Sequence, residues 1–549
     1  MDNIENNNVI QEQVEQQNDE IQFNYPNLSV SKPLLELKKG DTVFVVGALI
    51  ASIFMSVFGL FSGLAFGYLL SVVLMIVLFC TYLAKGVKVR FLPVVCGLLS
   101  LANSAVFICT TNGSVRFFGV MVSFLLSLVC FDGFVNQDQK GNRKTLGVFY
   151  SAASTMGNIG VCLKSVFSNS NGDKKSVGKA LLGLACAIPV LIVVVPLLIS
   201  SDDAFRGMMS NIFSNTFTTV LKIVFGASLS IFVISYGLSL KAGRVSKIRE
   251  ATFTGIESVY VISFLSAIGV CYLLYLFSQL AYFFSAFKGF LPDGDITYAQ
   301  YARKGFFEMC VIAVINLGIV FLSIFLARKR NGKVCHSVKG LTTFIAVFTL
   351  IIIATAISKM VLYIDAYGMT VLRITTSAFM LFLGVVFIAV ILRIYINKIN
   401  IVKTALIAVG CTVLILGTVN VNAVCAKYNY QAYKTQKLNT IDVEALYELG
   451  DEGIPYVVRI ACSKDKDASK EAQKYLAEAY LYDYFDDMQY AEDFTIDELK
   501  LNQKSKGFDY FSIPKATAYD ELYKFIESNP QFASKCHTYF DDSDQEYYW

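Results

Sequence analysis

Charged residues and histidine are scarce in this sequence. Asp, Glu, Lys and Arg make up 16% of the 549 residues, whereas soluble domains are about one-quarter charged, so a chain of ordinary soluble domains is excluded. The only histidines are His336 and His537, and no two cysteines have the CxxC spacing. Histidine and thiolate metal sites therefore have no support, and we expect no metal and no cofactor.

Recognisable catalytic patterns are also missing. The sequence contains no Walker phosphate-binding loop, no GxSxG nucleophile motif and no HExxH zinc motif. A polyprenyl-linked glycosyltransferase would usually carry an acidic residue in its first external loop, but the predicted loop here, Phe58-Gly-Leu-Phe-Ser-Gly, has none. The sequence assigns no catalytic residue, and an extracytoplasmic transferase is a disfavoured interpretation.

Long apolar runs are what the sequence has in abundance. Hydrophobic residues account for 55% of the chain, and they gather in segments of about 20 residues, the length that crosses the hydrocarbon core of a bilayer. We predict an all-α fold, a polytopic transmembrane bundle of about eleven helices with a small C-terminal helical domain. The predicted spans are 42–60, 61–84, 91–110, 115–131, 180–200, 219–240, 258–285, 306–326, 341–363, 371–392 and 404–424.

The distribution of Lys and Arg over the loops predicts the orientation. Alternate loops hold 22 of these residues in one set and six in the other, and the excess of positive charge marks cytoplasmic loops. We therefore predict a cytoplasmic N-terminus and, with eleven crossings, an extracytoplasmic C-terminus. The long loop 132–179 is moderately apolar and flanked by Lys and Arg, which favours an interfacial helix, with a re-entrant segment as the weaker alternative.

Composition divides the chain into three parts. Residues 1–40 are rich in Gln, Asn and Glu and lack the pattern of a signal peptide, so we predict a disordered cytoplasmic tail. Residues 41–425 form the predicted transmembrane domain. In residues 426–549 the apolar runs stop, acidic residues multiply and amphipathic helical spacing appears, which predicts an extracytoplasmic helical domain.

Two cysteines could form a disulfide. Most of the thirteen cysteines lie in apolar runs, where they are expected to pack as small hydrophobic side chains. Cys462 and Cys536 instead belong to the predicted external domain, where an oxidising compartment would permit a bond between them. Nothing in the sequence fixes their separation, so a disulfide and two free thiols both stay open.

Three polar stretches fall at the predicted outer face. They follow the fifth span, precede the eighth span, and join the ninth span to the tenth. Opposite charges beside a low-dielectric region are expected to pair. The cluster could bind a ligand or a lipid headgroup, but a structural ion-pair network is the favoured interpretation. The residues of this candidate ligand-binding cluster are Asp202, Asp203, Arg206, Arg303, Glu308, Lys359, Asp365 and Arg373.

The same stretches resemble a known family. Residues 198–206, 297–308 and 362–373 are similar to segments of an uncharacterised family of bacterial multi-pass membrane proteins, a domain of unknown function found largely in Firmicutes. Residues 422–433 and 442–455, with Asn422, Tyr433 and Pro455, extend the resemblance to about residue 460. It implies a bacterial plasma membrane and brings no established activity, substrate or catalytic residue.

Three functional hypotheses follow. The first is a non-enzymatic envelope sensor, scaffold or partner-binding component. The second is a transporter or lipid-handling protein that uses the outer-face cluster, which a broken helix or an inverted repeat would favour; neither is evident. The third is the disfavoured transferase. The expected partners are membrane lipid and a protein bound through the C-terminal domain, and no feature predicts binding of nucleic acid.

Single cysteines test the predicted topology. Thr440→Cys, Asp365→Cys and His336→Cys are introduced into a background without other reactive cysteines, and intact cells are treated with a membrane-impermeant thiol reagent. Positions 440 and 365 are expected to react, whereas position 336 is expected to react only after lysis. Reaction of position 440 only after lysis would place the C-terminal domain in the cytoplasm and contradict the count of eleven crossings.

Overall fold

A computed structural model describes most of the chain, and the regular elements in the described part are helices. The described residues are 35–61, 64–83, 91–135, 152–153, 155–168, 194, 201, 215–243, 255–288, 306–328, 334–396, 399, 401–436, 438, 440–479 and 511–535. Within these ranges the β-type pairing is limited to one bridge, between Ile256 and Ala327. The predicted all-α fold class is confirmed.

Ten helices in the described part are long and apolar enough to cross a membrane, and the protein is a multi-pass membrane protein. Each of the ten overlaps a predicted span, although α14 (His336–Tyr367) extends beyond the predicted 341–363 at both ends. Of the remaining predicted span, 180–200, the structure describes only residue 194. The ten spans are Lys39–Leu60, Phe66–Leu83, Phe91–Ile108, Gly113–Phe134, Thr218–Lys241, Ser258–Phe277, Phe306–Leu326, His336–Tyr367, Val371–Tyr395 and Ile401–Val419.

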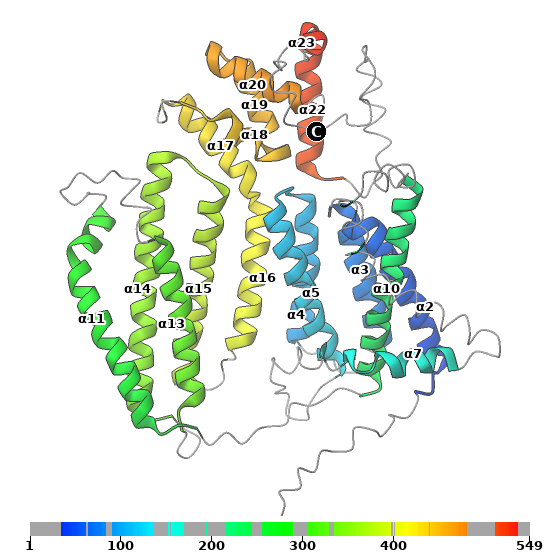
Figure 1. Ribbon diagram of the computed structural model, residues 1–549, viewed down its shortest axis with the longest axis vertical. Helices are drawn as coiled ribbons and strands as arrows, with labels where there is room; N and C mark the ends of the chain where they lie inside the picture. Colours follow the sequence, from blue (N-terminus) through cyan, green and yellow to red (C-terminus); the bar gives the residue numbers. More distant parts are fainter. Residues whose placement is uncertain are drawn as a thin grey trace, which may run out of the picture.

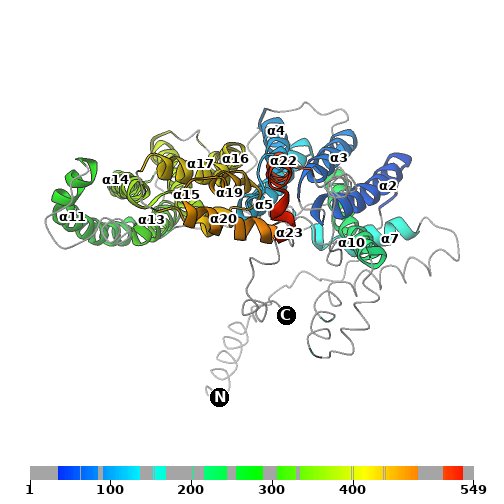
Figure 2. The ribbon, with the colours of Figure 1, turned by 90° about the horizontal axis from the view of Figure 1, so that it is seen from above.

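The spans form two groups with one helix between them (Figures 1 and 2). The first group contains α2 (Lys39–Phe54) and its continuation η1 (Met55–Leu60), α3 (Phe66–Leu83), α4 (Phe91–Ala105), α5 (Gly113–Val135) and α10 (Asn215–Lys241). The second contains α11 (Ser258–Lys288), α13 (Phe306–Leu326), α14 and α15 (Val371–Tyr395).

The helix between the groups is α16 (Ile401–Val419), which packs against α15 on one side and against α4 and α5 on the other. Its Val413 is buried in the core of the first group, and its Ala405 packs against a core of the second. The two groups therefore share one structural helix.

One end of the first group is held by polar contacts. Lys241 Nζ lies 2.7 Å from Asp41 Oδ1, which joins the end of α10 to the start of α2, and the Tyr82 hydroxyl donates to the same oxygen at 2.8 Å. α7 (Ile159–Ser168) lies across this end (Figure 1), where Ser165 Oγ accepts a hydrogen bond from the backbone N–H of Leu35. A helix is thus present within the loop 132–179, as expected.

The chain changes ends between α7 and α10. Asn158 Nδ2, just before α7, donates to Ser239 near the end of α10, so α7 lies at the Lys241 end of that helix. The 27 residues of α10 span about 40 Å at 1.5 Å per residue, which puts Asn215 at the opposite end.

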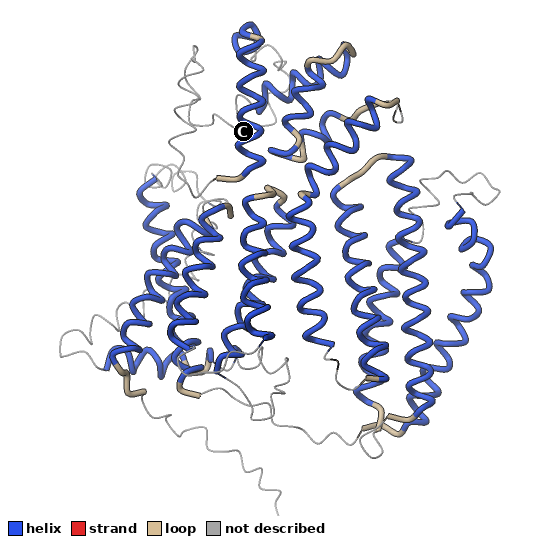
Figure 3. Tube along the Cα trace, turned by 180° about the vertical axis from the view of Figure 1, so that it is seen from behind, coloured by secondary structure: helices blue, strands red, loops and turns tan. Residues whose placement is uncertain are grey.

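The C-terminal helices gather at the other end of the bundle (Figure 3). They are α17 (Val421–Lys434), α18 (Val443–Tyr447), η3 (Gly450–Glu452), α19 (Ile454–Ala461), α20 (Lys466–Glu478), α22 (Ile513–Ser528) and α23 (Pro530–Lys535). They enclose their own hydrophobic core, in which Leu446, Ile454 and Ile460 are fully buried. Asp442 and Asp465 start α18 and α20 because each carboxylate accepts a hydrogen bond from a backbone N–H of the first turn.

Gly226 permits the close approach of α10 and α2. A Cβ atom on Gly226 would lie 2.6 Å from Ile53 Cα and 2.9 Å from Ser52 O, which are backbone atoms that cannot rotate away. Small residues commonly provide such close contacts between membrane helices.

We expect Gly226→Ala to destabilise the protein. Overpacking of this kind costs about 1–3 kcal/mol, so the midpoint of thermal unfolding in detergent should fall. Gly318→Ala on α13 is the matched control, because a Cβ there meets nothing within 4 Å, and alanine favours the helix over glycine. Equal unfolding midpoints for the two variants would contradict the close packing of α10 on α2.

Candidate functional site

The turn between α14 and α15 is tight and is closed by backbone contacts. Gly368 has a φ of +79°, a conformation that favours glycine, and it ends α14. Arg373, in the first turn of α15, donates to the carbonyl oxygens of Tyr367, at 3.3 Å, and Gly368. The Arg373 guanidinium also lies 4.0 Å from the ring centre of Tyr363. Arg373 therefore satisfies the free carbonyl end of α14.

An asparagine from α17 binds the same turn. Asn429 Oδ1 accepts from the backbone N–H of Met369 at 2.8 Å, and Asn429 Nδ2 donates to the Met369 carbonyl at 2.8 Å. A side chain on residue 368 would lie 2.8 Å from Asn429 Oδ1. Gly368 is thus needed both for the turn and for the approach of α17.

Four members of the predicted outer-face cluster lie in the described part of the chain: Glu308, Lys359, Asp365 and Arg373. Lys359 is buried two turns inside α14, and its ammonium group is attracted by the carboxylate of Glu308, which is exposed at the start of α13. Asp365 is exposed in the last turn of α14. The other predicted members, Asp202, Asp203, Arg206 and Arg303, lie outside the described residues, so the cluster as a whole stays a prediction.

A second set of contacts joins the C-terminal helices to the first group. Glu452, at the end of η3, is 5% exposed, and its carboxylate accepts hydrogen bonds from the residues that connect α4 to α5. The backbone N–H of Thr111 donates to Glu452 Oε1 at 2.8 Å, and the Thr111 hydroxyl donates to Oε2. The Thr110 hydroxyl donates to Oε1 at 3.4 Å. A buried carboxylate needs such donors because burial removes the hydrogen bonds that it would otherwise accept from water.

Two further asparagines at the start of α17 extend this set. Asn420 Nδ2 donates to the Cys109 carbonyl at 2.7 Å, and Asn112 Nδ2 donates to Asn422 Oδ1 at 2.6 Å. Asn422 Nδ2 in turn donates to the Leu449 carbonyl at 2.8 Å. We call the pairing of Asn429 with Met369, together with the pairing of Asn420, Asn422 and Glu452 with residues 109–112, the docking contacts.

A positive charge lies close to the buried carboxylate. Arg116, in the first turn of α5, is attracted by Glu452 and by Asp451. It also donates to the carbonyl oxygens of Thr110, at 2.8 Å, and Phe107, at 3.2 Å. Arg116 therefore stabilises both the negative charge of Glu452 and the loop that binds it.

Within the C-terminal helices, α17 is also joined to the start of α20. The Tyr433 hydroxyl donates to Asp465 Oδ2 at 2.6 Å. This hydrogen bond lowers the pKa of Asp465 and raises the pKa of Tyr433. Cys462 is exposed at the end of α19. Cys536 lies beyond the described residues, so the disulfide stays a prediction.

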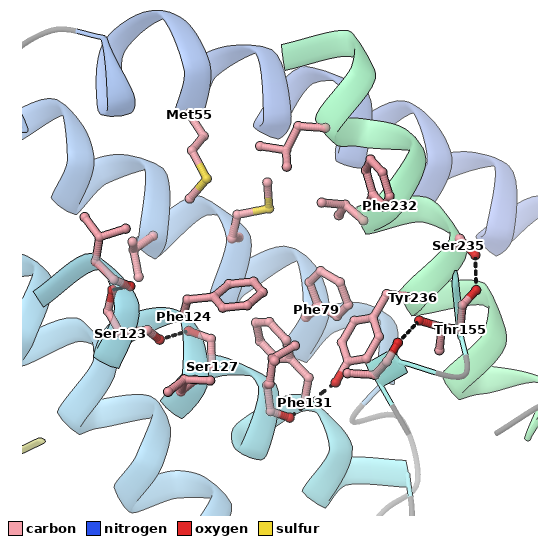
Figure 4. A pocket seen from close by; sticks show the side chains of 18 of the residues that line it. Met55, Phe79, Ser123, Phe124, Ser127, Phe131, Thr155, Phe232, Ser235 and Tyr236 are labelled. Atoms are coloured by element: carbon pink, nitrogen blue, oxygen red, sulfur yellow. Dashed lines mark hydrogen bonds between the residues drawn. The ribbon is translucent and has the colours of Figure 1, made fainter. Parts of the chain in front are cut away.

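A cavity of about 640 Å³ lies inside the first group (Figure 4). Its walls come from η1, α3, α5 and α10, and Ala152, Ala153, Thr155, Met156 and Ile159 line it on the side of α7. Almost all of the lining is aliphatic, aromatic or methionine. The side chains that line it are Met55, Leu60, Tyr68, Val72, Met75, Phe79, Val120, Met121, Ser123, Phe124, Leu125, Ser127, Leu128, Phe131, Ala152, Ala153, Thr155, Met156, Ile159, Leu229, Phe232, Val233, Ser235 and Tyr236.

Only weak signals in the sequence point to these sites. Asn422 belongs to a stretch that carries the family resemblance, but the pairing of Thr111 with Glu452 joins positions 341 residues apart. The cavity is formed where η1, α3, α5 and α10 pack together, and this packing is not encoded in the apolar runs. Among the described residues, no group of three or more His, Cys, Asp and Glu side chains could hold a metal ion.

Comparison with known proteins identifies the family. The family described as "Domain of unknown function (DUF4153)" matches residues 74–460, more than half of the chain, and the chain belongs to this family. No curated protein and no solved structure matches the chain. The matched region contains all of the residues that make the docking contacts.

Removal of the Glu452 carboxylate is expected to weaken the attachment of the C-terminal helices. Hydrogen bonds to a charged group contribute about 1.5–3 kcal/mol, so Glu452→Ala should accelerate trypsin cleavage of these helices in the folded protein by about tenfold or more. Glu452→Gln keeps the size and one acceptor oxygen and should have a smaller effect.

The matched control is Glu448→Ala, because Glu448 is exposed only four residues away. Its cleavage rate should equal that of the unmodified protein. If Glu452→Ala and Glu448→Ala behave alike, the buried carboxylate does not hold the C-terminal helices in place.

Proposed function

We propose that this member of the family is a partner-binding sensor or scaffold of the bacterial plasma membrane, in which an extracytoplasmic C-terminal domain is coupled to the membrane helices. The observation that carries the proposal is that the docking contacts join this domain to both groups of spans. Asn429 reaches the turn at Met369 in the second group, and Glu452 reaches Thr111 in the first. A partner that alters the domain would thereby act on both groups.

The proposed orientation places the N-terminus in the cytoplasm and the C-terminal domain outside. In the described part, Lys241, Arg393 and Lys403 lie at the end of the bundle opposite to the C-terminal helices, together with Lys39. The excess of positive charge in cytoplasmic loops supports this direction.

The charge of the C-terminal region indicates what kind of partner it would bind. Residues 426–549 contain 24 Asp and Glu against 14 Lys and Arg, whereas the whole chain has a net charge of +4. An acidic surface attracts a basic surface and accelerates its association. The proposed partner is therefore a protein with a basic face on the outer side of the membrane.

Site-specific photo-crosslinking in intact cells tests this function. A photoreactive amino acid is placed at Lys466 or at Lys470, both exposed on α20, and at Ser337, exposed at the opposite end of the bundle, as a control. The two α20 positions should yield an adduct with the same protein, and Ser337 should not.

Two further measurements separate a specific partner from chance contacts. The adduct should weaken when the ionic strength rises from about 0.1 M to about 1 M, because the Debye length falls from about 10 Å to about 3 Å. It should also weaken several-fold in Asn429→Ala, which leaves the α20 surface intact but loosens the docking contacts. An adduct pattern shared by α20 and Ser337, or none from α20, would contradict the proposal.

A further inference from the structure

The cavity in the first group opens sideways at the depth of the bilayer core. Its rim includes Met121 and Phe124 on α5 and Phe232 on α10, whose side chains are 47%, 60% and 48% exposed. Phe124 and Phe232 lie well inside their helices, away from the helix ends. The surroundings of such an opening are hydrocarbon chains, because the helices that carry it are membrane spans.

The cavity offers no free polar group to a ligand. Each hydroxyl among the described lining residues already has a partner within the protein (Figure 4). Tyr68 pairs with Ser123 at 2.8 Å, Ser127 donates to the Ser123 carbonyl at 2.8 Å, and Tyr236 donates to the Leu128 carbonyl at 3.3 Å.

The inner end of the cavity is closed in the same way. Ser235 donates to the Thr155 carbonyl at 3.0 Å, and the Thr155 hydroxyl donates to the Ala152 carbonyl at 2.6 Å. These bonds tie Thr155 to α10 and use the remaining hydroxyls of the described lining. A ligand that enters from the side therefore meets a wall whose polar groups are already hydrogen-bonded within the protein.

The cavity is unfavourable both for ordered water and as an empty space. A buried water needs two to four polar partners, and an empty volume of about 640 Å³ would deprive the lining side chains of dispersion contacts. The volume lies in the range of about 300–1,000 Å³ that is typical of small-molecule sites. The occupant must be apolar, flexible and available at the rim.

We propose that this cavity binds a hydrocarbon chain of a membrane lipid, which enters between Phe124 and Phe232 while its headgroup stays at the bilayer surface. The chain restores the dispersion contacts of the lining without burying a polar group. Its recognition depends on the shape of the cavity rather than on the headgroup. The site is separate from the docking contacts and does not depend on a partner protein.

A photoactivatable lipid tests the proposal. The protein is reconstituted in phosphatidylglycerol–phosphatidylethanolamine vesicles that contain phosphatidylglycerol with a diazirine in its acyl chain, and the adducts are mapped by mass spectrometry. Met75 lines the cavity and is only 8% exposed, so an adduct there reports a chain inside the cavity. We expect adducts on Met75 with this probe and none with a diazirine in the headgroup.

Cavity-filling variants provide the comparison. Val233→Phe on α10 and Ala153→Leu on the segment before α7 fill the cavity from two different elements, and each should reduce the Met75 adduct by about tenfold or more. Val270→Phe on α11 is the matched control, because Val270 is 56% exposed outside the cavity and the change adds the same volume. Gel filtration and the unfolding midpoint show which variants fold.

Two outcomes would overturn the proposal. One is the absence of Met75 adducts in the unmodified protein, which would mean that no lipid chain enters the cavity. The same result is expected if another segment of the protein occupies the cavity. The other is an equal yield in folded Ala153→Leu, folded Val233→Phe and Val270→Phe.

Discussion

The structure depends on the requirement that polar groups buried at the edge of the membrane find hydrogen-bonding partners. Glu452 is buried among donors from residues 110 and 111, and Asn429 binds both backbone groups of Met369. These partners come from the turns of two different groups of spans. The C-terminal helices are therefore bound to both turns through the buried Glu452 and the half-buried Asn429.

This arrangement explains why a helical domain at one end matters for the whole bundle. α16 packs between the two groups and continues through Asn420 into α17, so the chain leads directly from the shared helix into the domain that binds both turns. A change in the spacing of the two groups of spans would strain the docking contacts. Because coupling is reciprocal, a partner bound to the domain would in turn change the spacing of the groups. The lipid-chain cavity lies within the first group, on α3, α5 and α10.

The sequence determined the spans far better than the contacts between them. Apolar runs of sufficient length predicted ten helices that the structure contains, since helix formation in a membrane depends on local composition. The predicted connection between the ninth and tenth spans is present as the turn of residues 368–370 between α14 and α15. Arg373 binds the carbonyl groups that end α14, a local role that the sequence did not indicate. Glu452 escaped prediction since its partners are distant in the chain.

Double electron–electron resonance spectroscopy, which measures the distance between two spin labels, tests the central claim that the C-terminal domain is held to both groups of spans. A spin label at Lys466 on α20 is paired with one at Ser114 at the start of α5, and separately with one at Thr370 in the α14–α15 turn; all three positions are exposed. Two narrow distance distributions are expected, and both should broaden when Asn429→Ala and Glu452→Ala are combined. Broad distributions in the unmodified protein, or distributions that the double variant leaves unchanged, would contradict the claim.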